Sequence, residues 1–311
     1  MARRTPSAAV EPASGREQLE LFDAVLRDVS VKVDAVSLEH PLFALRPTRA
    51  ERIYSLGEDC EIRVVPSTLG CPTIDDKDVL VYIASQIRAG LNAGLKVAPT
   101  VNINGYDLLR TTGRGVGGAD YKRLSAALGR LRGATVMTRI RTGGIRQESG
   151  FGLIDSWELV KQETVHAPRI RIRISDWYFR AIITNQVLTV EPDYFRLSGL
   201  SKRLYELVRK HLGRQIAWRC DLEKLRTKAG SQTPIRRFKF EVGRILQAAS
   251  AARVGGQDDP HRNWLLILHG NVFAAYQNSD EGRAERDKDH RRYLRSSRPV
   301  SSLVEQAGAP Q

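Results

Sequence analysis

One series of sequence patterns occurs twice in this chain, and it limits the folds that the chain can adopt. In the first copy, helical periodicity over residues 102–112 and 119–133 flanks a glycine-rich turn, TGRGVGG. Alternating apolar residues then predict the two strands of a hairpin, over 134–142 and 152–161. Two helices joined by a turn and followed by a hairpin form a winged helix-turn-helix, whose second helix enters the major groove of DNA.

The second copy contains the same elements in the same order. Apolar stripes predict helices at 199–213, 222–230 and 235–250, with a short strand at 215–220 before the second of them. A hairpin around Gly270-Asn271 follows. The two copies share this order but little residue identity, so the sequence predicts an internal duplication. The expected fold class is α+β, with two tandem winged helix-turn-helix domains and small antiparallel sheets.

The segment before the first copy has a helical pattern of its own. Residues 16–36 place apolar side chains three and four positions apart, at Leu19, Phe22, Leu26, Val29, Val33 and Val36. This spacing predicts an amphipathic helix, which either docks on its own domain or forms a dimerisation zipper. Polar composition predicts disorder at 1–15 and 278–311.

Four expected segments follow from these patterns. They are an N-terminal arm at 1–40, a first winged-helix domain at 41–188, a second at 189–277 and a disordered tail at 278–311. Within the first domain, the run PRIRIRIS alternates strictly and predicts a further strand with its isoleucines inward.

Positive charge is concentrated in two windows of the sequence. The whole chain carries 49 Lys and Arg against 35 Asp and Glu, a formal net charge of +14. Residues 101–146 contain nine basic and two acidic side chains, and residues 196–244 contain fourteen and four. Two compact basic segments predict two contact areas for a polyanion, and double-stranded DNA fits the predicted fold. A membrane surface and acidic proteins remain as alternative partners.

Candidate DNA-binding residues are the polar side chains on the outer faces of the second helices, the hairpin and the turn. An Arg in the first turn of such a helix can donate two hydrogen bonds to guanine. The candidates in the first copy are Lys122, Arg123 and Arg130 on the helix and Arg139, Arg141 and Arg146 on the hairpin. In the second copy they are Arg236, Arg237, Lys239 and Arg244, preceded by Ser231, Gln232 and Thr233, which either contact phosphates or cap the helix.

Several chemistries are not supported by the sequence. The GxGxxG match at 113–118 follows a predicted helix, whereas a dinucleotide-binding turn must follow a strand. The six histidines form no HxH or HExxH motif, and no GxxxxGK[ST] loop is present. We expect no metal or other cofactor and no enzymatic activity. Asp75, Asp76 and Asp78 are expected to form the N-terminus of a helix.

The cysteines and the hydropathy of the chain indicate in which cellular compartment the protein is expected. Cys60, Cys71 and Cys220 form no CxxC pair, which favours reduced thiols. No run of about 20 apolar residues could span a membrane, and the N-terminus lacks the apolar region of a secretory signal. We therefore expect a cytoplasmic protein.

Several motifs occur in an order that resembles one family. They are HPLFAL from His40, the segments 61–87 and 120–138, Tyr106-Asp107-Leu-Leu, and FRLSGLSKRLYELVRKH over 195–211. Together they resemble the replication initiator protein A family of plasmids over residues 38–277. The resemblance implies an initiator that binds direct repeats (iterons) at a replication origin, helps to open the duplex, and recruits a host initiator ATPase and the replicative helicase. It also implies a monomer that initiates and a homodimer that represses.

Three other functions remain open from the sequence. A winged-helix transcriptional regulator would have the same architecture without a role at an origin. A nuclease or nicking relaxase would require clustered metal ligands, and a basic RNA-binding protein would prefer structured RNA.

Overall fold

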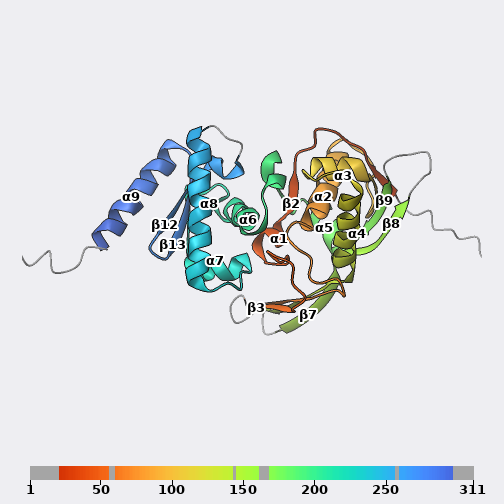
Figure 1. The fold of residues 1–311 in the computed structure, drawn as a ribbon, viewed down its shortest axis with the longest axis horizontal. Coiled ribbons are helices and arrows are strands. Elements are labelled where there is room, and N and C mark those ends of the chain that lie inside the picture. Colours follow the sequence, from red (N-terminus) through yellow and green to blue (C-terminus); the bar gives the residue numbers. More distant parts are fainter. Residues whose placement is uncertain (1–20, 56–59, 143–144, 161–167, 256–258, 297–311) are drawn as a thin grey trace, which may run out of the picture.

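The computed structural model describes residues 21–296, apart from 56–59, 143–144, 161–167 and 256–258. The described residues form helices and four small sheets, which confirms the predicted α+β class (Figure 1). The identity of the two copies as winged-helix domains and the domain boundaries stay predictions.

The first copy begins with a helix and a strand that the structure places before the predicted helix pair. Its elements are α2 (Lys77–Asn92), β5 (Thr100–Asn104), α3 (Gly105–Thr111) and α4 (Gly118–Gly133). The Asn104 side chain accepts a hydrogen bond from the backbone N–H of Tyr106, which fixes the start of α3. On α4 the predicted stripe is confirmed, because Leu124, Leu128 and Leu131 are fully buried.

The second copy has the same order of elements. These are α6 (Gly199–Leu212), β11 (Ala217–Asp221), α7 (Leu222–Ala229), α8 (Ile235–Gly255), a 3₁₀ turn η2 (Pro260–Asn263), β12 (Trp264–His269) and β13 (Val272–Gln277). The Asp221 carboxylate accepts from the backbone N–H groups of Glu223 and Lys224 and caps α7. Gly270 takes a φ of +59° in the tight turn between the hairpin strands.

The sheets show how the two copies correspond. In the second copy the strand order is β11-β13-β12. In the first copy it is β5-β9-β8, with β8 at Ile154–Val160 and β9 at Arg169–Ile174, and β1 (Leu21–Ala24) added beyond β5. In each copy the strand after the first helix pairs with the second strand of a hairpin. The hairpin equivalent to β12–β13 is therefore β8–β9.

The predicted hairpin of 134–142 with 152–161 is wrong in its second strand. Instead β6 (Thr135–Thr142) pairs with β7 (Ile145–Gly152) and also with β4 (Cys60–Val65), which pairs with β3 (Arg52–Ser55). The segment of β7 contains glycines up to Gly152 and few apolar residues, so its period gave no strand signal. The β6–β7 hairpin is thus an insertion between α4 and the equivalent hairpin.

The predicted amphipathic helix at 16–36 is wrong for the part that the structure describes, and residues 1–20 lie outside that part. Strand β1 pairs with β5 in parallel, and β2 (Lys32–Asp34) pairs with β10 (Val187–Thr189). Only the short α1 (Ala35–Glu39) is helical. Phe22 and Ala24 are buried while Leu21 is exposed. Burial thus alternates with the period of two that is typical of a β-strand, not with the period of a helix.

The predicted disorder of the tail is wrong for residues 280–296, and residues 297–311 are not described. Helix α9 (Asp280–Ser296) packs on β12 and β13 and extends at the left of Figure 1. Arg219 on β11 forms ion pairs with Glu285 and Asp289 at 2.6 and 2.5 Å. The Tyr276 hydroxyl also donates to Asp289 at 2.7 Å. These contacts lie far apart in sequence, so composition alone could not indicate them.

The two copies meet at their first helices, α2 and α6. A small core contains residues from both, among them Val81 of α2 and Tyr205 of α6, together with Tyr194 of the 3₁₀ turn η1 (Pro192–Arg196). Helix α5 (Asp176–Ile183), which is capped by Ser175, also packs against α2. The relative placement of the copies is thus set by buried contacts on α2 and α6.

Candidate nucleic-acid interface

Helix α8 carries four of the thirteen predicted DNA-binding residues, namely Arg236, Arg237, Lys239 and Arg244. Its inner side buries Phe238, Val242, Leu246, Ala249 and Ala252. At 3.6 residues per turn, the positions that fall opposite this stripe share one face. The exposed residues on that face include Arg236, Arg237, Phe240, Arg244 and Gln247, and we call them the α8 outer face.

Two of the basic residues of α8 are oriented by neighbouring side chains. The Arg237 Nε donates to the Glu241 Oε1 at 3.2 Å, and Arg46 from the first copy donates to the same oxygen at 3.1 Å. The Lys239 Nζ donates to the Oδ1 of Asn271 in the β12–β13 turn at 3.1 Å. Arg237 stays 65% exposed, so its Nη atoms remain accessible for a polyanion.

The turn between α7 and α8 is closed by its own hydroxyl groups. The Ser231 Oγ and Thr233 Oγ1 lie 2.8 Å apart, and Arg226 donates to the Thr233 carbonyl at 3.1 Å. Gln232 is exposed. Among the described hydrogen bonds, none joins the Ser231 or Thr233 hydroxyl to a backbone N–H of α8, so the capping alternative also stays a prediction, and Gln232 faces outward. Phosphate contact by these three residues stays a prediction.

On α4 the three candidates differ in what surrounds them. Lys122 is exposed, and Arg123 is 74% exposed while paired with Asp120 at 2.5 Å. Arg130 instead makes two hydrogen bonds to the carboxylate of Asp76, at 2.7 and 2.8 Å. Because this bidentate pair joins α4 to the start of α2, we assign Arg130 to fixing the position of α4.

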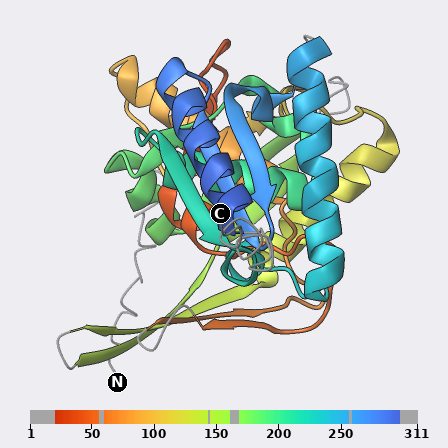
Figure 2. The same cartoon turned by 90° about the vertical axis from the view of Figure 1, so that its left-hand side faces the viewer.

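Of the three candidate arginines on the β6–β7 hairpin, the structure describes the side chain of Arg139. Arg139 lies between two carboxylates, 3.4 Å from Glu148 and 3.6 Å from Glu61. The side chains of Arg141 and Arg146 lie outside the part of the chain that the structure describes. In Figure 2 the sheet of β3, β4, β6 and β7 extends toward the lower left, away from the edge where α4 and α8 lie. The β6–β7 hairpin is therefore a poor counterpart of the wing that the sequence suggested.

The topological correspondence indicates other residues that the sequence analysis missed. Strand β9 buries Ile170, Ile172 and Ile174, as predicted, and directs arginines to its other side. Arg171 pairs with Glu158 at 3.2 Å and Arg173 with Asp155 at 3.5 Å. The strict alternation of PRIRIRIS already predicts these arginines on the outward side, but the wrong hairpin assignment kept them out of the DNA-binding candidates.

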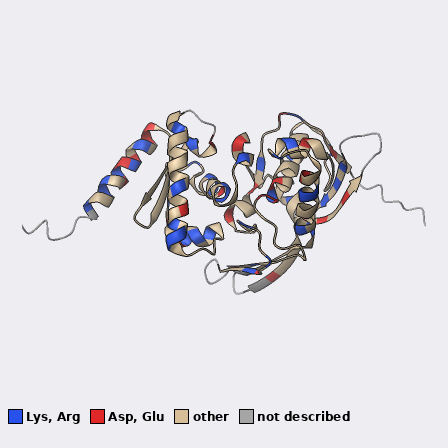
Figure 3. Cartoon of the chain, viewed as in Figure 1, with Lys and Arg blue, Asp and Glu red and all other residues tan. Residues whose placement is uncertain are grey.

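Helices α4 and α8 lie on the same side of the molecule. Both run along the front in Figure 1, and both lie at the right edge after the rotation of Figure 2. Lys and Arg occur along both helices and at the base of α8, where α7 adds further basic residues (Figure 3). One face of the chain thus presents two basic helices, one from each copy.

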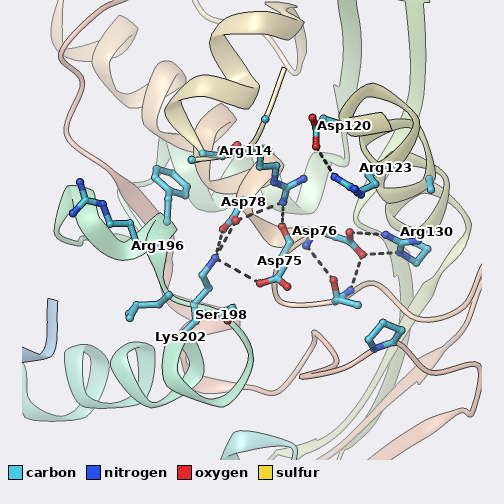
Figure 4. Close-up of a pocket in the computed structure, with 18 residues that line it drawn as sticks. Asp75, Asp76, Asp78, Arg114, Asp120, Arg123, Arg130, Arg196, Ser198 and Lys202 are labelled. Carbon is cyan, nitrogen blue, oxygen red and sulfur yellow. Dashed lines mark hydrogen bonds and ion pairs between the residues drawn. The ribbon is translucent and has the colours of Figure 1, made fainter. Parts of the chain in front are cut away.

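Between α4 and α6 lies a charged cavity of about 530 Å³, which Figure 4 shows. Its basic side chains are held by the acidic start of α2. The Lys202 Nζ lies 2.9 Å from Asp78, and the Arg114 Nη2 lies 3.5 Å from the same carboxylate. Burial raises the pKa of Asp78 to about 6, against the opposing charge of Lys202. Because Lys202 and Arg114 are neutralised by the acidic start of α2, we do not assign this cavity as an anion-binding site. Its ion pairs instead link α2 of the first copy to α6 of the second.

Deeper between the copies, a second set of ion pairs is fully buried. The Lys77 Nζ and the Glu206 Oε1 lie 2.6 Å apart, and both side chains are 1% exposed. Glu206 also accepts from Arg203 at 3.0 Å and from the Tyr194 hydroxyl at 2.6 Å. Burial alone would raise the pKa of Glu206, but Lys77 and Arg203 outweigh it and lower that pKa. The pKa of Lys77 is lowered by burial.

The residues that the structure describes contain no group of three or more His, Cys, Asp and Glu side chains arranged to hold a metal ion. No helix among them combines the length and apolar character needed to cross a membrane.

Known proteins are similar to this chain in sequence, and others are similar to it in fold. The family model for "Replication initiator protein A" matches residues 32–251. A "Putative replication protein" of Wigglesworthia glossinidia brevipalpis is 31% identical over 225 residues, which cover 70% of this chain and 81% of that protein. The chain is thus a replication initiator by class. Within that class, it belongs to the replication initiator protein A family.

Solved structures support the fold independently of close sequence similarity. A crystal structure of domains 2 and 3 of RctB superimposes with a TM-score of 0.57 at 16% identity, covering 76% of this chain and 95% of that one. A second structure of the same two domains gives a TM-score of 0.52 at 11% identity and covers 80% and 99%. At these identities the likeness concerns the fold alone.

Proposed function

We propose that this initiator binds the direct repeats (iterons) of its replication origin as double-stranded DNA, through two tandem winged-helix domains. In each copy the second helix of the pair, α4 or α8, lies in a major groove. The observation that carries the proposal is that both helices lie on one face and expose Lys or Arg at their N-terminal turns.

The geometry of duplex DNA fits two such helices. Major-groove faces that point the same way recur about every 10 base pairs, so two helices would cover roughly 20 base pairs of one repeat. Phosphate contacts from Lys and Arg would supply most of the affinity, and base contacts from the α8 outer face would supply selectivity. Arg236 and Arg237, in the first turn of α8, are the best placed for guanine.

The family relationship supports further parts of the proposal. After binding, the protein would help to open the duplex and would recruit a host initiator ATPase and the replicative helicase. It would act in the bacterial cytoplasm on plasmid DNA, as a monomer in initiation and as a homodimer in copy control. We propose no catalytic role and no cofactor.

A gel-shift titration on the origin DNA tests the binding proposal. If about 8 phosphates are neutralised, log K should fall with log salt with a slope of about −7. Replacing Arg236 and Arg237 by Ala should remove most of the preference for the cognate repeat over a scrambled one. The matched control is Arg214→Ala, an exposed residue beyond the end of α6. An unchanged preference in the double variant would show that another element contacts the bases.

A transcriptional regulator is the second candidate, because its DNA contacts would be the same. Transformation separates the two functions: a plasmid that carries only the origin and this gene should replicate in a suitable host if the chain is an initiator. Failure to replicate, with DNA binding intact, would favour the regulator.

A further inference from the structure

Helix α8 exposes an aromatic side chain in the middle of its basic face. Phe240 is 66% exposed, and among the described residues no other Phe and no Trp is as open to solvent. Water contact is unfavourable for a phenyl ring of this size. Phe238, two residues earlier, is fully buried in the core of the second copy, whereas the Phe240 ring lies on the opposite side of the helix and adds nothing to that core.

A glycine one turn further along the same face also lacks a reason within the fold. Glycine inside a helix costs about 1 kcal/mol relative to Ala. Gly90 of α2 and Gly129 of α4 are explained by crowding, because a Cβ there would lie 2.8 Å from Phe22 and 2.6 Å from Leu69. A Cβ at Gly243 would have no such neighbour within 4 Å. The open space beside Gly243 is thus available to a partner.

The charges around these two positions limit what the partner can be. Arg236 lies one turn before Phe240 and Arg244 one turn after it, all exposed on the α8 outer face. An apolar protein surface would have to desolvate these guanidinium groups without pairing them, at a high cost. Duplex DNA offers anionic phosphates for the arginines and one apolar group in the major groove, the C5-methyl of thymine.

We infer that Phe240 contacts thymine methyl groups in the major groove, and that Gly243 lets the helix backbone approach the bases closely at that point. The inference rests on the proposed function and adds to it the base that this part of α8 recognises. Gln247, a further turn along, lies where its amide could pair with the adenine edge of the same A·T-rich segment.

The test uses a duplex selected by the full chain from a random pool, made once with thymine and once with deoxyuridine, which lacks the C5-methyl. Wild type should bind the uridine duplex about fourfold more weakly for each methyl group that Phe240 touches, the effect of burying one group of that size. Phe240→Ala should weaken binding to the thymine duplex by a similar factor and then be indifferent to the uridine exchange. Phe240→Leu should keep part of the thymine preference.

Two further variants make the result unambiguous. Gly243→Ala should raise the Tm, because it strengthens the helix, and at the same time weaken DNA binding. Val254→Ala is the control, since Val254 is exposed on the same face but about 21 Å further along the helix. It should bind both duplexes like wild type.

Each contrary result identifies what failed. If Phe240→Ala loses as much affinity on uridine exchange as wild type, Phe240 does not touch the methyl groups and the inference is wrong. If Phe240→Ala binds DNA normally but lowers self-association in sedimentation, the phenyl ring serves an interface between copies of the chain, and the inference is likewise wrong. If the pool yields no preferred duplex at all, the proposed function itself fails.

Discussion

The buried ion pairs between α2 and α6 give the strongest stability prediction. Replacing Glu206 by Gln keeps the volume of the side chain but removes its charge. Lys77 then has no carboxylate at 2.6 Å, and Arg203 loses its partner at 3.0 Å. Breaking one buried pair by removing a single partner typically costs about 3–5 kcal/mol. We expect a loss of this size for Glu206→Gln, a large share of the stability of an ordinary domain.

The measurement is urea unfolding at pH 7, followed by tryptophan fluorescence. Trp264 reports on this region because its ring lies 4.8 Å from that of Tyr205, the residue before Glu206. Glu223→Gln on α7 is the matched control. Glu223 pairs with Arg226 at 2.9 Å but is 57% exposed, and such surface pairs contribute about 1 kcal/mol or less.

The pH dependence adds an independent check on the same residue. Because the pKa of Glu206 is lowered in the folded protein, its charge stabilises the fold above the unfolded pKa. That contribution is lost as the pH falls through the folded pKa, so wild type should approach Glu206→Gln in stability in acid. If the variant loses no more than the Glu223→Gln control at pH 7, the buried network does not hold the copies together.

Four further substitutions address single residues. Arg130→Ala should lower the free energy of unfolding by about 2 kcal/mol, because it leaves the buried Asp76 without its bidentate partner. Lys122→Ala should leave the free energy of unfolding unchanged and weaken DNA binding. Urea unfolding and gel shifts on both variants test this. The pKa of Asp78 is raised to about 6 in the folded protein, whereas in the unfolded chain this carboxyl loses its proton near pH 4. The free energy of unfolding of wild type, relative to that of Asp78→Asn, should therefore fall as the pH rises from about 4 to 6. A difference between the two proteins that stays constant over this range would contradict the prediction. Arg52 is 2% exposed and its Nη atoms have no hydrogen-bond partner among the described residues, so Arg52→Met should raise the free energy of unfolding by about 1 kcal/mol or more, measured by calorimetry.

Much of the second copy could be predicted because its signals are local. The apolar stripe of α8 and the Gly270-Asn271 turn each lie within a few residues, and both are confirmed. The same holds for helix α4 and for the inward isoleucines of β9.

The elements that sequence reasoning missed depend on partners far along the chain. Strand β1 exists because it pairs with β5, and Leu21 aligns with Thr100 in that pairing. Helix α9 is held by Arg219, which lies on a strand far earlier in the sequence. The sequence around β1 and around α9 does not indicate these distant partners. The spacing of apolar residues therefore favoured a helix at 16–36, and polar composition favoured disorder after residue 278.

The candidate site divides in the same way. Exposure of Arg236, Arg237 and Lys122 followed from the apolar stripes of their helices. The role of Arg130 did not, because Asp76 lies 54 positions earlier and pairs with it only in the fold. Phe240 was not a candidate because the candidates were chosen among polar side chains, although the sequence already places Phe240 opposite the buried Phe238 on the helix.

The placement of charge in the core explains how two separate helix pairs could act on one duplex. A buried ion pair gives little net stability over an apolar pair of the same volume, but it accepts only one geometry. Here the pairs connect α2 with α6, the first helices of the two copies, and we expect them to fix the distance between α4 and α8. Lys77→Met with Glu206→Leu removes one ion pair completely but leaves the buried Arg203 and the Tyr194 hydroxyl without their acceptor, so we expect it to fold with reduced stability and to hold the two copies less strictly. On duplexes whose half-sites are moved apart by one or two base pairs, wild type should lose most of its affinity and the double variant distinctly less. Equal losses in a gel-shift titration would show that the network contributes nothing to the spacing of the two basic helices.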